Sequence, residues 1–256
     1  MLITPIITSR IEESGPGVRM SQALSCPRQI AYSASAFPIT NRPNARRMRT
    51  LAHGTAIHGF LRAEIAAGLW QGVEPVDVPT RDEDEVELTY ETQGTIITGH
   101  PDGVVDVTQG GEIHRAVLEV KSTNGFGFRM RKAEGPSPEH VAQGSMYARQ
   151  LSLEWVFVVY YNKDQDNVMC FLEALDTDLV LRAMNGWRDA LDAAQQMEGG
   201  KLEWDDDRLP DRAYQPDNKG TLPWQCGYCR YVSGCWEGAE LIGSEDKPKY
   251  RSVEHR

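Results

Sequence analysis

Asp102, Glu119 and Lys121 are the residues whose types and spacing best fit a catalytic site. Side chains alternate between the two faces of a β-strand, so Glu119 and Lys121 share one face and Val120 points into the opposite, apolar layer. Two carboxylates and one ammonium around one point suit a divalent cation such as Mg²⁺ or Mn²⁺. Such an ion polarises a phosphoryl oxygen and acidifies a bound water, and a nearby lysine can hold that water. This is the equipment of phosphodiester hydrolysis.

Two strands and a turn must bring these side chains together. Residues 95–107 and 113–120 are apolar and rich in β-branched side chains, and the Gln-Gly-Gly at 109–111 predicts a turn between them. Pairing of the two strands would place Asp102 beside Glu119. A Glu-x-Lys pair on an exposed strand is, however, often only a solvated ion pair that adds little stability.

Periodicity and turn residues predict the remaining elements. A helix is expected over 50–67, with Gly68 as its C-cap and His58 inside it. A helix from His140 places Gln143 and Tyr147 on one face. The other expectations are a short helix over 21–33 with Cys26 near its middle and Pro27 disturbing it, a Gly-rich basic loop over 123–138, strands 154–162 and 167–175 with Cys170 buried in the second, and an amphipathic helix over 177–197.

Composition describes an ordinary soluble chain. With 256 residues, 40% hydrophobic and 25% charged, it suits one α/β domain with additions or two small ones. No apolar run reaches membrane length and the N-terminus lacks a secretory pattern, so a cytoplasmic protein is expected. The net charge of −10 argues against nonspecific coating of nucleic acid but allows a local basic channel.

Two basic clusters are candidate DNA contacts, with ordinary solvated loop charge as the alternative. They consist of Arg42, Arg46, Arg47 and Arg49, and of Arg129, Arg131 and Lys132. The acidic run 82–85 is expected to be a solvated loop, because it has no partner at metal-ligand spacing.

Three of the five cysteines, Cys226, Cys229 and Cys235, form a C-x2-C-x5-C pattern. Cytoplasmic cysteines at this density usually bind metal rather than form disulfides. Cys26 is the natural fourth ligand, because Cys170 lies in a strand expected to be buried. Four thiolates fit an iron–sulfur cluster as well as zinc.

In this order the motifs resemble the PD-(D/E)xK nuclease superfamily, in particular the RecB-like iron–sulfur exonucleases of the Cas-four type found in CRISPR loci and phages. The likeness covers residues 24–236. The matching motifs are Cys26-Pro27-Arg28, Gly54 to His58, Gly99-His100-Pro101-Asp102, Glu119-Val120-Lys121, Gln143 with Tyr147, and the three late cysteines.

The resemblance implies an α/β, restriction-endonuclease-like mixed sheet flanked by helices. It implies a single nuclease domain over 1–256, with the core at 50–197, an iron–sulfur region formed by 20–49 and 198–240, and a flexible tail at 241–256.

The resemblance also implies roles for individual residues. His58, Asp102, Glu119 and the Val120 carbonyl would bind Mg²⁺ or Mn²⁺, Lys121 would orient or activate the attacking water, and Gln143 and Tyr147 would position DNA and the lysine. Cys26, Cys226, Cys229 and Cys235 would hold a structural 4Fe–4S cluster, with Zn²⁺ as the alternative. Arg46, Arg47, Arg49, Arg129, Arg131 and Lys132 would contact DNA.

The expected function is a metal-dependent DNA exonuclease acting on single-stranded ends or overhangs. It would serve phage recombination and replication, in the host cytoplasm, or CRISPR spacer processing, with a recombination or CRISPR adaptation protein as partner. The alternatives are an endonuclease of the same fold and a catalytically silent DNA-binding adaptor.

Overall fold

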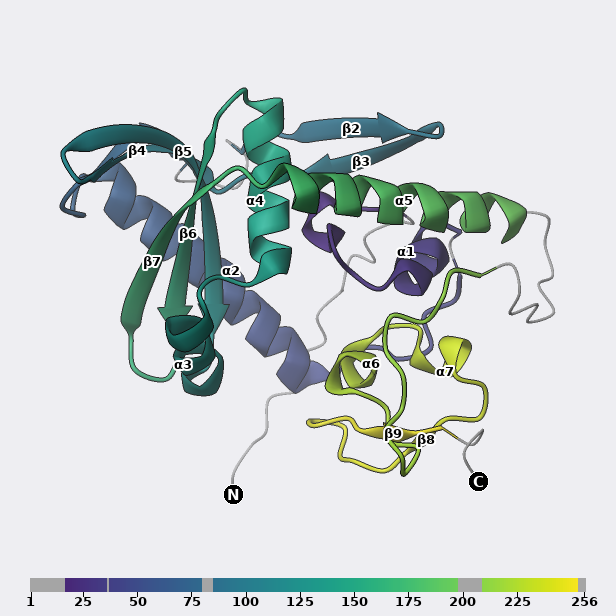
Figure 1. Cartoon of the computed structure of the whole chain (residues 1–256). Coiled ribbons are helices and arrows are strands. Elements are labelled where there is room, and N and C mark those ends of the chain that lie inside the picture. The colour runs from purple at the N-terminus through teal and green to yellow at the C-terminus, as the bar shows by residue number, and fades with distance from the viewer. Residues whose placement is uncertain (1–16, 36, 80–84, 198–208, 253–256) are drawn as a thin grey trace, which may run out of the picture. The chain divides into compact units, whose positions relative to one another are not determined.

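The computed structural model describes residues 17–35, 37–79, 85–197 and 209–252 (Figure 1). The chain divides into two compact units. A central unit comprises Arg19–Leu24 and His53–Trp187, and a terminal unit comprises Met1–Val18, Ser25–Ala52 and Arg188–Arg256. The catalytic core expected over 50–197 therefore corresponds to a unit that ends ten residues earlier, at Trp187.

The central unit is built on a five-stranded mixed sheet of order β1-β4-β5-β6-β7. Its strands are β1 (Val73–Asp77), β4 (Gly103–Gln109), β5 (Glu112–Thr123), β6 (Trp155–Asn162) and β7 (Asn167–Ala174). Strands β5 and β6 are parallel, and the other neighbouring pairs are antiparallel. A parallel pair needs a crossover, which helices α3 (Gly125–Glu134) and α4 (Pro138–Gln150) supply. This mixed α/β architecture is the predicted class.

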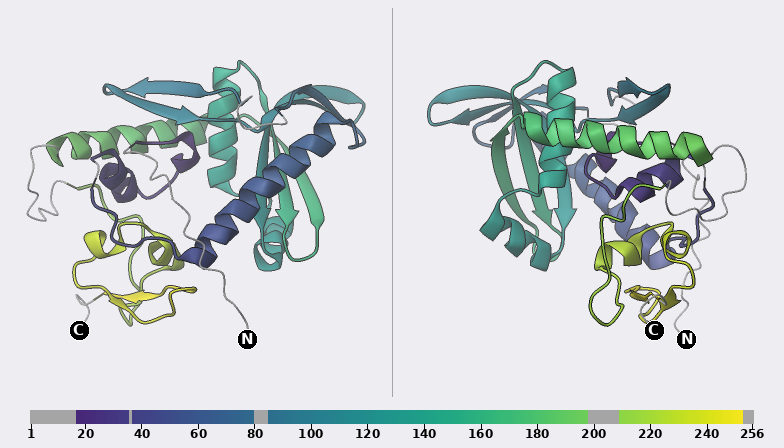
Figure 2. Two further views of the ribbon diagram at one scale, coloured as in Figure 1. Left: turned by 180° about the vertical axis from the view of Figure 1, so that it is seen from behind. Right: turned by 45° about the vertical axis from the view of Figure 1, so that its right-hand side comes forward.

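Alternation along β5 divides its side chains between two helices. Leu118 and Val120 are buried with Ile57 and Leu61 of helix α2 (Ala45–Ala66). The views from front and back show α4 against the other face of the sheet (Figures 1 and 2). Val120 thus points into the apolar layer as predicted, while its neighbours Glu119 and Lys121 face the side that carries α4. The helix predicted from residue 50 is present but begins at Ala45.

The predicted strand 95–107 proved to be two strands, β3 (Thr95–Gly99) and β4. Strand β3 pairs with β2 (Leu88–Thr92) in a separate ribbon. Pro101, which has no N–H to donate, lies in the break between them. Gly103 then starts β4 with φ +149°, and a Cβ there would lie 2.8 Å from the Asp77 carbonyl oxygen. The turn after β4 is confirmed, since Gly110 and Gly111 both have positive φ.

The basic segment 123–138 is mostly helical, so its prediction as a loop was wrong. Helix α3 begins after Asn124, whose side-chain oxygen accepts a hydrogen bond from the Gly127 N–H at 2.8 Å. This N-cap provides an acceptor for a backbone N–H of the first helical turn, which stabilises the helix in a glycine-rich segment. Strands β6 and β7 and helix α5 (Thr177–Met197) lie where they were predicted. Cys170 was expected to be buried but is exposed, because β7 is the last strand of the sheet.

The terminal unit contains short elements. They are α1 (Pro27–Ala34), α6 (Trp224–Tyr228), α7 (Val232–Cys235), β8 (Glu240–Leu241) and β9 (Tyr250–Arg251). The helix predicted over 21–33 is instead a 3-10 turn, η1 (Met20–Gln22), followed by α1, with Cys26 as N-cap rather than mid-helix. Pro27 occupies the first helical turn, where its missing N–H is harmless, so it starts the helix instead of disturbing it.

The flexible tail expected over 241–256 is also corrected. Strand β9 pairs with β8, and Tyr250 is buried in a cluster with Leu222 and Trp236. Residues 1–16, 36, 80–84, 198–208 and 253–256 lie outside the described residues. The parts of the predicted segments that fall on them stay predictions. Among the helices that are described, none combines the length and the apolar character needed to cross a membrane.

Candidate active site

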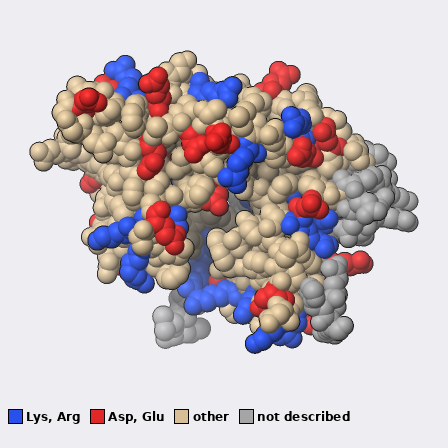
Figure 3. Space-filling view, viewed as in Figure 1, with Lys and Arg blue, Asp and Glu red and all other residues tan. Residues whose placement is uncertain are grey.

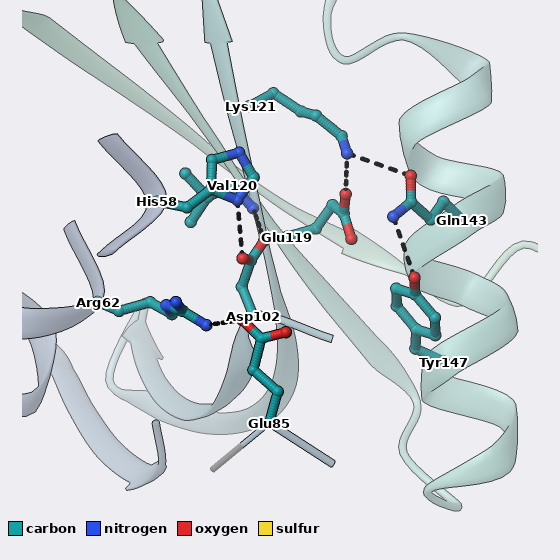
Figure 4. A network of polar contacts seen from close by, with 9 residues as sticks. All are labelled: His58, Arg62, Glu85, Asp102, Glu119, Val120, Lys121, Gln143 and Tyr147. Atoms are coloured by element: carbon teal, nitrogen blue, oxygen red, sulfur yellow. Dashed lines mark hydrogen bonds and ion pairs between the residues drawn. The ribbon is translucent and has the colours of Figure 1, made fainter. Parts of the chain in front are cut away.

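Strand register places Asp102 opposite Glu119. In the antiparallel pair β4–β5, Gly103 is paired with Leu118. Asp102 precedes Gly103 and Glu119 follows Leu118, so these two residues lie opposite each other. Asp102 is only 8% exposed; its Oδ2 accepts a hydrogen bond from the Val120 N–H at 2.7 Å, and its Oδ1 lies 2.9 Å from His58 Nδ1 (Figure 4). The predicted motif residues of α2, β4 and β5 therefore meet at one point.

Glu119 is a buried carboxylate with little to stabilise its charge. It is 1% exposed, and its Oε2 accepts no hydrogen bond from any described residue. The Lys121 ammonium forms an ion pair with its Oε1. Burial raises the pKa of Glu119 to about 7; the nearby Lys121 charge lowers it, and Asp102 raises it further. Because unpaired buried oxygens are costly, this pocket favours a cation.

A chain of hydrogen bonds fixes the Lys121 ammonium. Lys121 Nζ donates to Gln143 Oε1 at 3.1 Å, and Gln143 Nε2 donates to the Tyr147 hydroxyl at 3.1 Å (Figure 4). Gln143 and Tyr147 lie one turn apart on α4, as predicted. Burial, reinforced by the charge of Glu119, raises the pKa of Tyr147 well above its ordinary value, so the hydroxyl stays protonated. Tyr147 thereby sets which end of the Gln143 amide faces Lys121.

The glycine of the Gly99-His100-Pro101-Asp102 motif allows this tyrosine to approach. A Cβ at Gly99 would lie 2.6 Å from Tyr147 Cε1 and 2.8 Å from Met20 Cβ. The backbone N–H of His100 also bonds the Tyr147 hydroxyl. The motif therefore both presents Asp102 and supports the residue that orders Gln143.

The donor set fits a hard divalent cation, although its side chains are paired with one another here. Within residues 17–35, 37–79, 85–197 and 209–252, no group of three or more His, Cys, Asp or Glu side chains is arranged to hold a metal ion. His58 bonds Asp102 directly, and Lys121 neutralises Glu119. The buried Oε2 of Glu119, which has no partner among the described residues, is the observation that fits a metal ligand, and oxygen donors are those that Mg²⁺ and Mn²⁺ prefer.

Sequence reasoning missed a second charged pair near this site. Arg62 lies one turn after His58 on α2, is only 1% exposed, and forms an ion pair with Glu85 (Figure 4). Glu85 was assigned to a solvated acidic loop, which is wrong for this residue. The signal was an arginine between Leu61 and Ile65, inside the apolar stripe of the helix.

The two predicted basic clusters lie in different units. In the terminal unit, Arg46 pairs with Asp246 at 3.1 Å, and Arg47 donates to the Tyr228 carbonyl. Arg49 is exposed on α2. On α3 of the central unit, Arg131 pairs with Glu134, and Arg129 and Lys132 are exposed. Acidic and basic side chains alternate over the face in Figure 3, in keeping with the net negative charge.

The four predicted cysteine ligands meet in the terminal unit. Cys26, Cys226, Cys229 and Cys235 are free thiols and line one pocket together with Arg28, Tyr32 and Trp236. Cys170 belongs to the central unit instead. Cys26 is the N-cap of α1, Cys226 lies in α6, Cys229 is the C-cap of α6, and Cys235 ends α7. Helix α1 is thus far in sequence from the other two, which follow one another.

Burial keeps the thiols of Cys226, Cys229 and Cys235 protonated. Burial raises the pKa of Cys226 to about 11 and of Cys229 to about 12, and the neighbouring thiols add to the effect. The Tyr231 N–H points to Cys229 Sγ at 3.5 Å, and burial raises the pKa of Cys235 as well, although the charges of Arg28 and Arg212 lower it in part. A metal ion there would have to displace the protons of these thiols, because thiolates are the metal-binding form of cysteine.

No protein-family model matches the chain, and a search of curated proteins finds no similar sequence. Several solved structures resemble it, and three of them are described here. One, titled SSO0001, is 16% identical, with 86% of this chain and 85% of that chain covered and a TM-score of 0.46. An alkaline exonuclease (LHK-Exo) from Laribacter hongkongensis, alone and in complex with dAMP, is 17% identical, with 72% and 90% covered and a TM-score of 0.48. Scores of this size establish nothing about activity, which has to be inferred from the side chains described above.

Proposed function

We propose that the chain is a metal-dependent DNA exonuclease, hydrolysing phosphodiester bonds from DNA ends. The observation that carries this proposal is the buried Glu119 carboxylate, which lies beside Asp102 and is paired among the described residues only with Lys121, a lysine held by Gln143. A buried carboxylate with an unsatisfied oxygen destabilises the folded protein, and such groups are typical of catalytic and ligand-binding sites. A surface ion pair would need neither the burial nor the chain of hydrogen bonds.

The metal site would be formed by His58, Asp102, Glu119 and the Val120 carbonyl, and would take Mg²⁺ or Mn²⁺. A divalent ion there supplies Lewis acidity at the scissile phosphate and a more acidic bound water. Asp102 is already anchored by the Val120 N–H, so the loss of its contact with His58 leaves it in place.

Lys121 would hold the attacking water and balance charge on the phosphate oxygens. When Glu119 binds the metal ion, the Lys121 ammonium would still donate to Gln143 Oε1, which lies 3.1 Å away. Gln143 is in turn held by Tyr147, so the lysine is positioned by groups on a rigid helix. Preorganised positioning of this kind lowers the reorganisation that the reaction requires.

The four cysteines would hold a 4Fe–4S cluster, with Zn²⁺ as the alternative, and its role would be structural. Cys26 precedes the other three by about 200 residues, and linking such distant positions removes unfolded-state entropy. Work on DNA ends in phage recombination or in trimming for CRISPR adaptation would suit such an enzyme.

The test compares nucleotide release from end-labelled linear DNA and from closed circular DNA, with Mg²⁺ or Mn²⁺. We expect the wild type to digest linear DNA only, and Lys121→Ala to lose turnover while still binding DNA. Lys163→Ala, a lysine outside the site, serves as the matched control and should digest normally.

Each other outcome selects a different reading. Cutting of the closed circle would make the chain an endonuclease of the same fold. Retained turnover by Lys121→Ala would remove that lysine from the mechanism. No release by the wild type with either metal would favour the silent adaptor.

A further inference from the structure

Helix α6 carries two aromatic side chains on its outer surface. Trp224 is 70% exposed and Tyr228 is 44% exposed. They lie one turn apart, with ring centroids separated by 6.4 Å and planes inclined by 66°. Leaving a tryptophan this exposed forgoes a large apolar stabilisation, so an adjacent exposed pair indicates a binding surface.

The opposite face of α6 is tightly packed, which fixes the direction of the aromatic pair. Cys226 and Gly227 are the buried residues of the helix. A Cβ at Gly227 would lie 2.3 Å from the Pro248 carbonyl oxygen, so α6 rests directly on the backbone of the C-terminal segment. The rings are therefore presented by a held element rather than by a loose loop.

One arginine side chain lies beside the Tyr228 ring. The Arg47 guanidinium lies 5.0 Å from the centre of the Tyr228 ring, and its Nη2 donates to the Tyr228 carbonyl at 3.2 Å. Arg46 and Arg49 lie on the same helical turn as Arg47. Residues 38–63 contain no Asp or Glu. Asp246 offsets part of this charge, through its pair with Arg46.

We propose that Trp224 and Tyr228 form a stacking platform for the bases of single-stranded nucleic acid, with Arg47 and Arg49 beside the phosphates. Aromatic faces that stack bases, next to cations that follow the backbone, are the recognition chemistry of single strands. Trp, Tyr and Arg are also enriched at protein interfaces, so a second copy of the chain is the alternative occupant that the sedimentation experiment below tests. The platform rests on the proposed function only in supposing that its strand is the DNA being digested.

Binding can be measured without turnover. Fluorescence anisotropy of labelled oligo(dT) with the full chain in EDTA separates binding from cleavage. Loss of one stacked base should weaken binding by about tenfold in Trp224→Ala. Trp224→Phe keeps a ring and should recover most of the affinity. Ile113→Ala is the matched control, since Ile113 is 71% exposed but lies on β5, outside the terminal unit.

Two further readouts test the parts of the platform. Stacking on Trp224 should quench its fluorescence on addition of oligo(dT), and Trp224→Phe should lose that quenching while it still binds. Arg49→Gln should reduce the slope of log affinity against log salt by about 1, as expected for one lost phosphate contact.

Wild-type affinity of Trp224→Ala for oligo(dT), or an equal loss in Ile113→Ala, would overturn the platform. So would an effect of Trp224→Ala on sedimentation alone, which would make the pair a contact between copies of the chain. These results are separable from the nuclease test. Turnover by the wild type with unchanged binding of Trp224→Ala refutes only the platform, whereas a Trp224-dependent loss of binding in a chain without turnover refutes only the nuclease.

Discussion

Replacing Tyr147 with phenylalanine tests the chain of hydrogen bonds that ends at Lys121. The change removes one hydroxyl, which accepts from Gln143 Nε2 at 3.1 Å and also interacts with the His100 amide. The ring remains, so packing against Gly99 is preserved. Two buried donors lose their acceptor, and each such loss costs about 1 kcal/mol. We therefore expect a loss of about 2 kcal/mol in stability, or about 4–8 °C in Tm.

The effect on turnover should be separate from the effect on stability. Without Tyr147, nothing dictates which end of the Gln143 amide faces the lysine, and the amino group would repel the ammonium. If transition-state positioning loses the net value of one hydrogen bond, kcat falls about tenfold, with KM little changed. The assay is initial-rate digestion of end-labelled DNA, alongside thermal unfolding.

Tyr160→Phe provides the matched control. The Tyr160 hydroxyl likewise serves two partners, accepting from the Ser137 N–H at 2.9 Å and lying 2.7 Å from His140 Nδ1. It should lose similar stability but keep its kcat. Equal losses of kcat in the two variants would show that unfolding alone explains the effect. A Tyr147→Phe enzyme with full kcat would refute the positioning role.

Three other substitutions probe separate features. Cys229→Ser should lose both the cluster absorbance and solubility, whereas Cys170→Ser should lose neither. Gly99→Ala should destabilise the protein by about 1–3 kcal/mol through overpacking, whereas Gly59→Ala, with no atom within 4 Å of the added methyl, should not. Burial lowers the pKa of His140 to about 3, so unfolding takes up a proton below about pH 6.5. The free energy of unfolding should therefore fall by up to about 1.4 kcal/mol for each unit by which the pH drops below about 6.5. His140→Gln should lack this dependence in urea titrations at pH 7 and pH 5.

Each of these has a contrary result. A colourless Cys229→Ser protein with unchanged melting and activity would remove the stapling role, and an equally stable Gly99→Ala would mean that the Tyr147 ring can shift. Parallel pH profiles of wild type and His140→Gln would show that another group titrates. The sign of the histidine effect follows from its depressed pKa, which leaves the stability intact above pH 6.5.

The sequence predicts those parts of the site that depend on local pattern. Strand alternation places Glu119 and Lys121 together, and the Gly110-Gly111 turn fixes the register that brings Asp102 opposite Glu119. Both effects act within about twenty residues. Helical spacing likewise aligned Gln143 with Tyr147.

Features that depend on tertiary neighbours could not be predicted in this way. The ion pair of Arg62 with Glu85 joins a helix to a loop, and no periodicity announces it. The exposure of Cys170 depends on the order of strands in the sheet, which a strand pattern leaves open. Helix α3 was missed because a single side chain, that of Asn124, offsets a glycine-rich composition.

The terminal unit is built from segments on both sides of the central unit in the sequence, and this sets an order of events during synthesis. Domains generally fold as units as the chain emerges from the ribosome. The central unit is complete once Trp187 has emerged, whereas the terminal unit must wait for the segment that carries Cys226 and Cys229. Until then Cys26 has no partners and stays available to metal-delivery factors or oxidants. A nascent chain stalled so that Trp187 but not Cys226 has left the ribosome should therefore resist protease over residues 53–187 while the segment 25–52 is still cut.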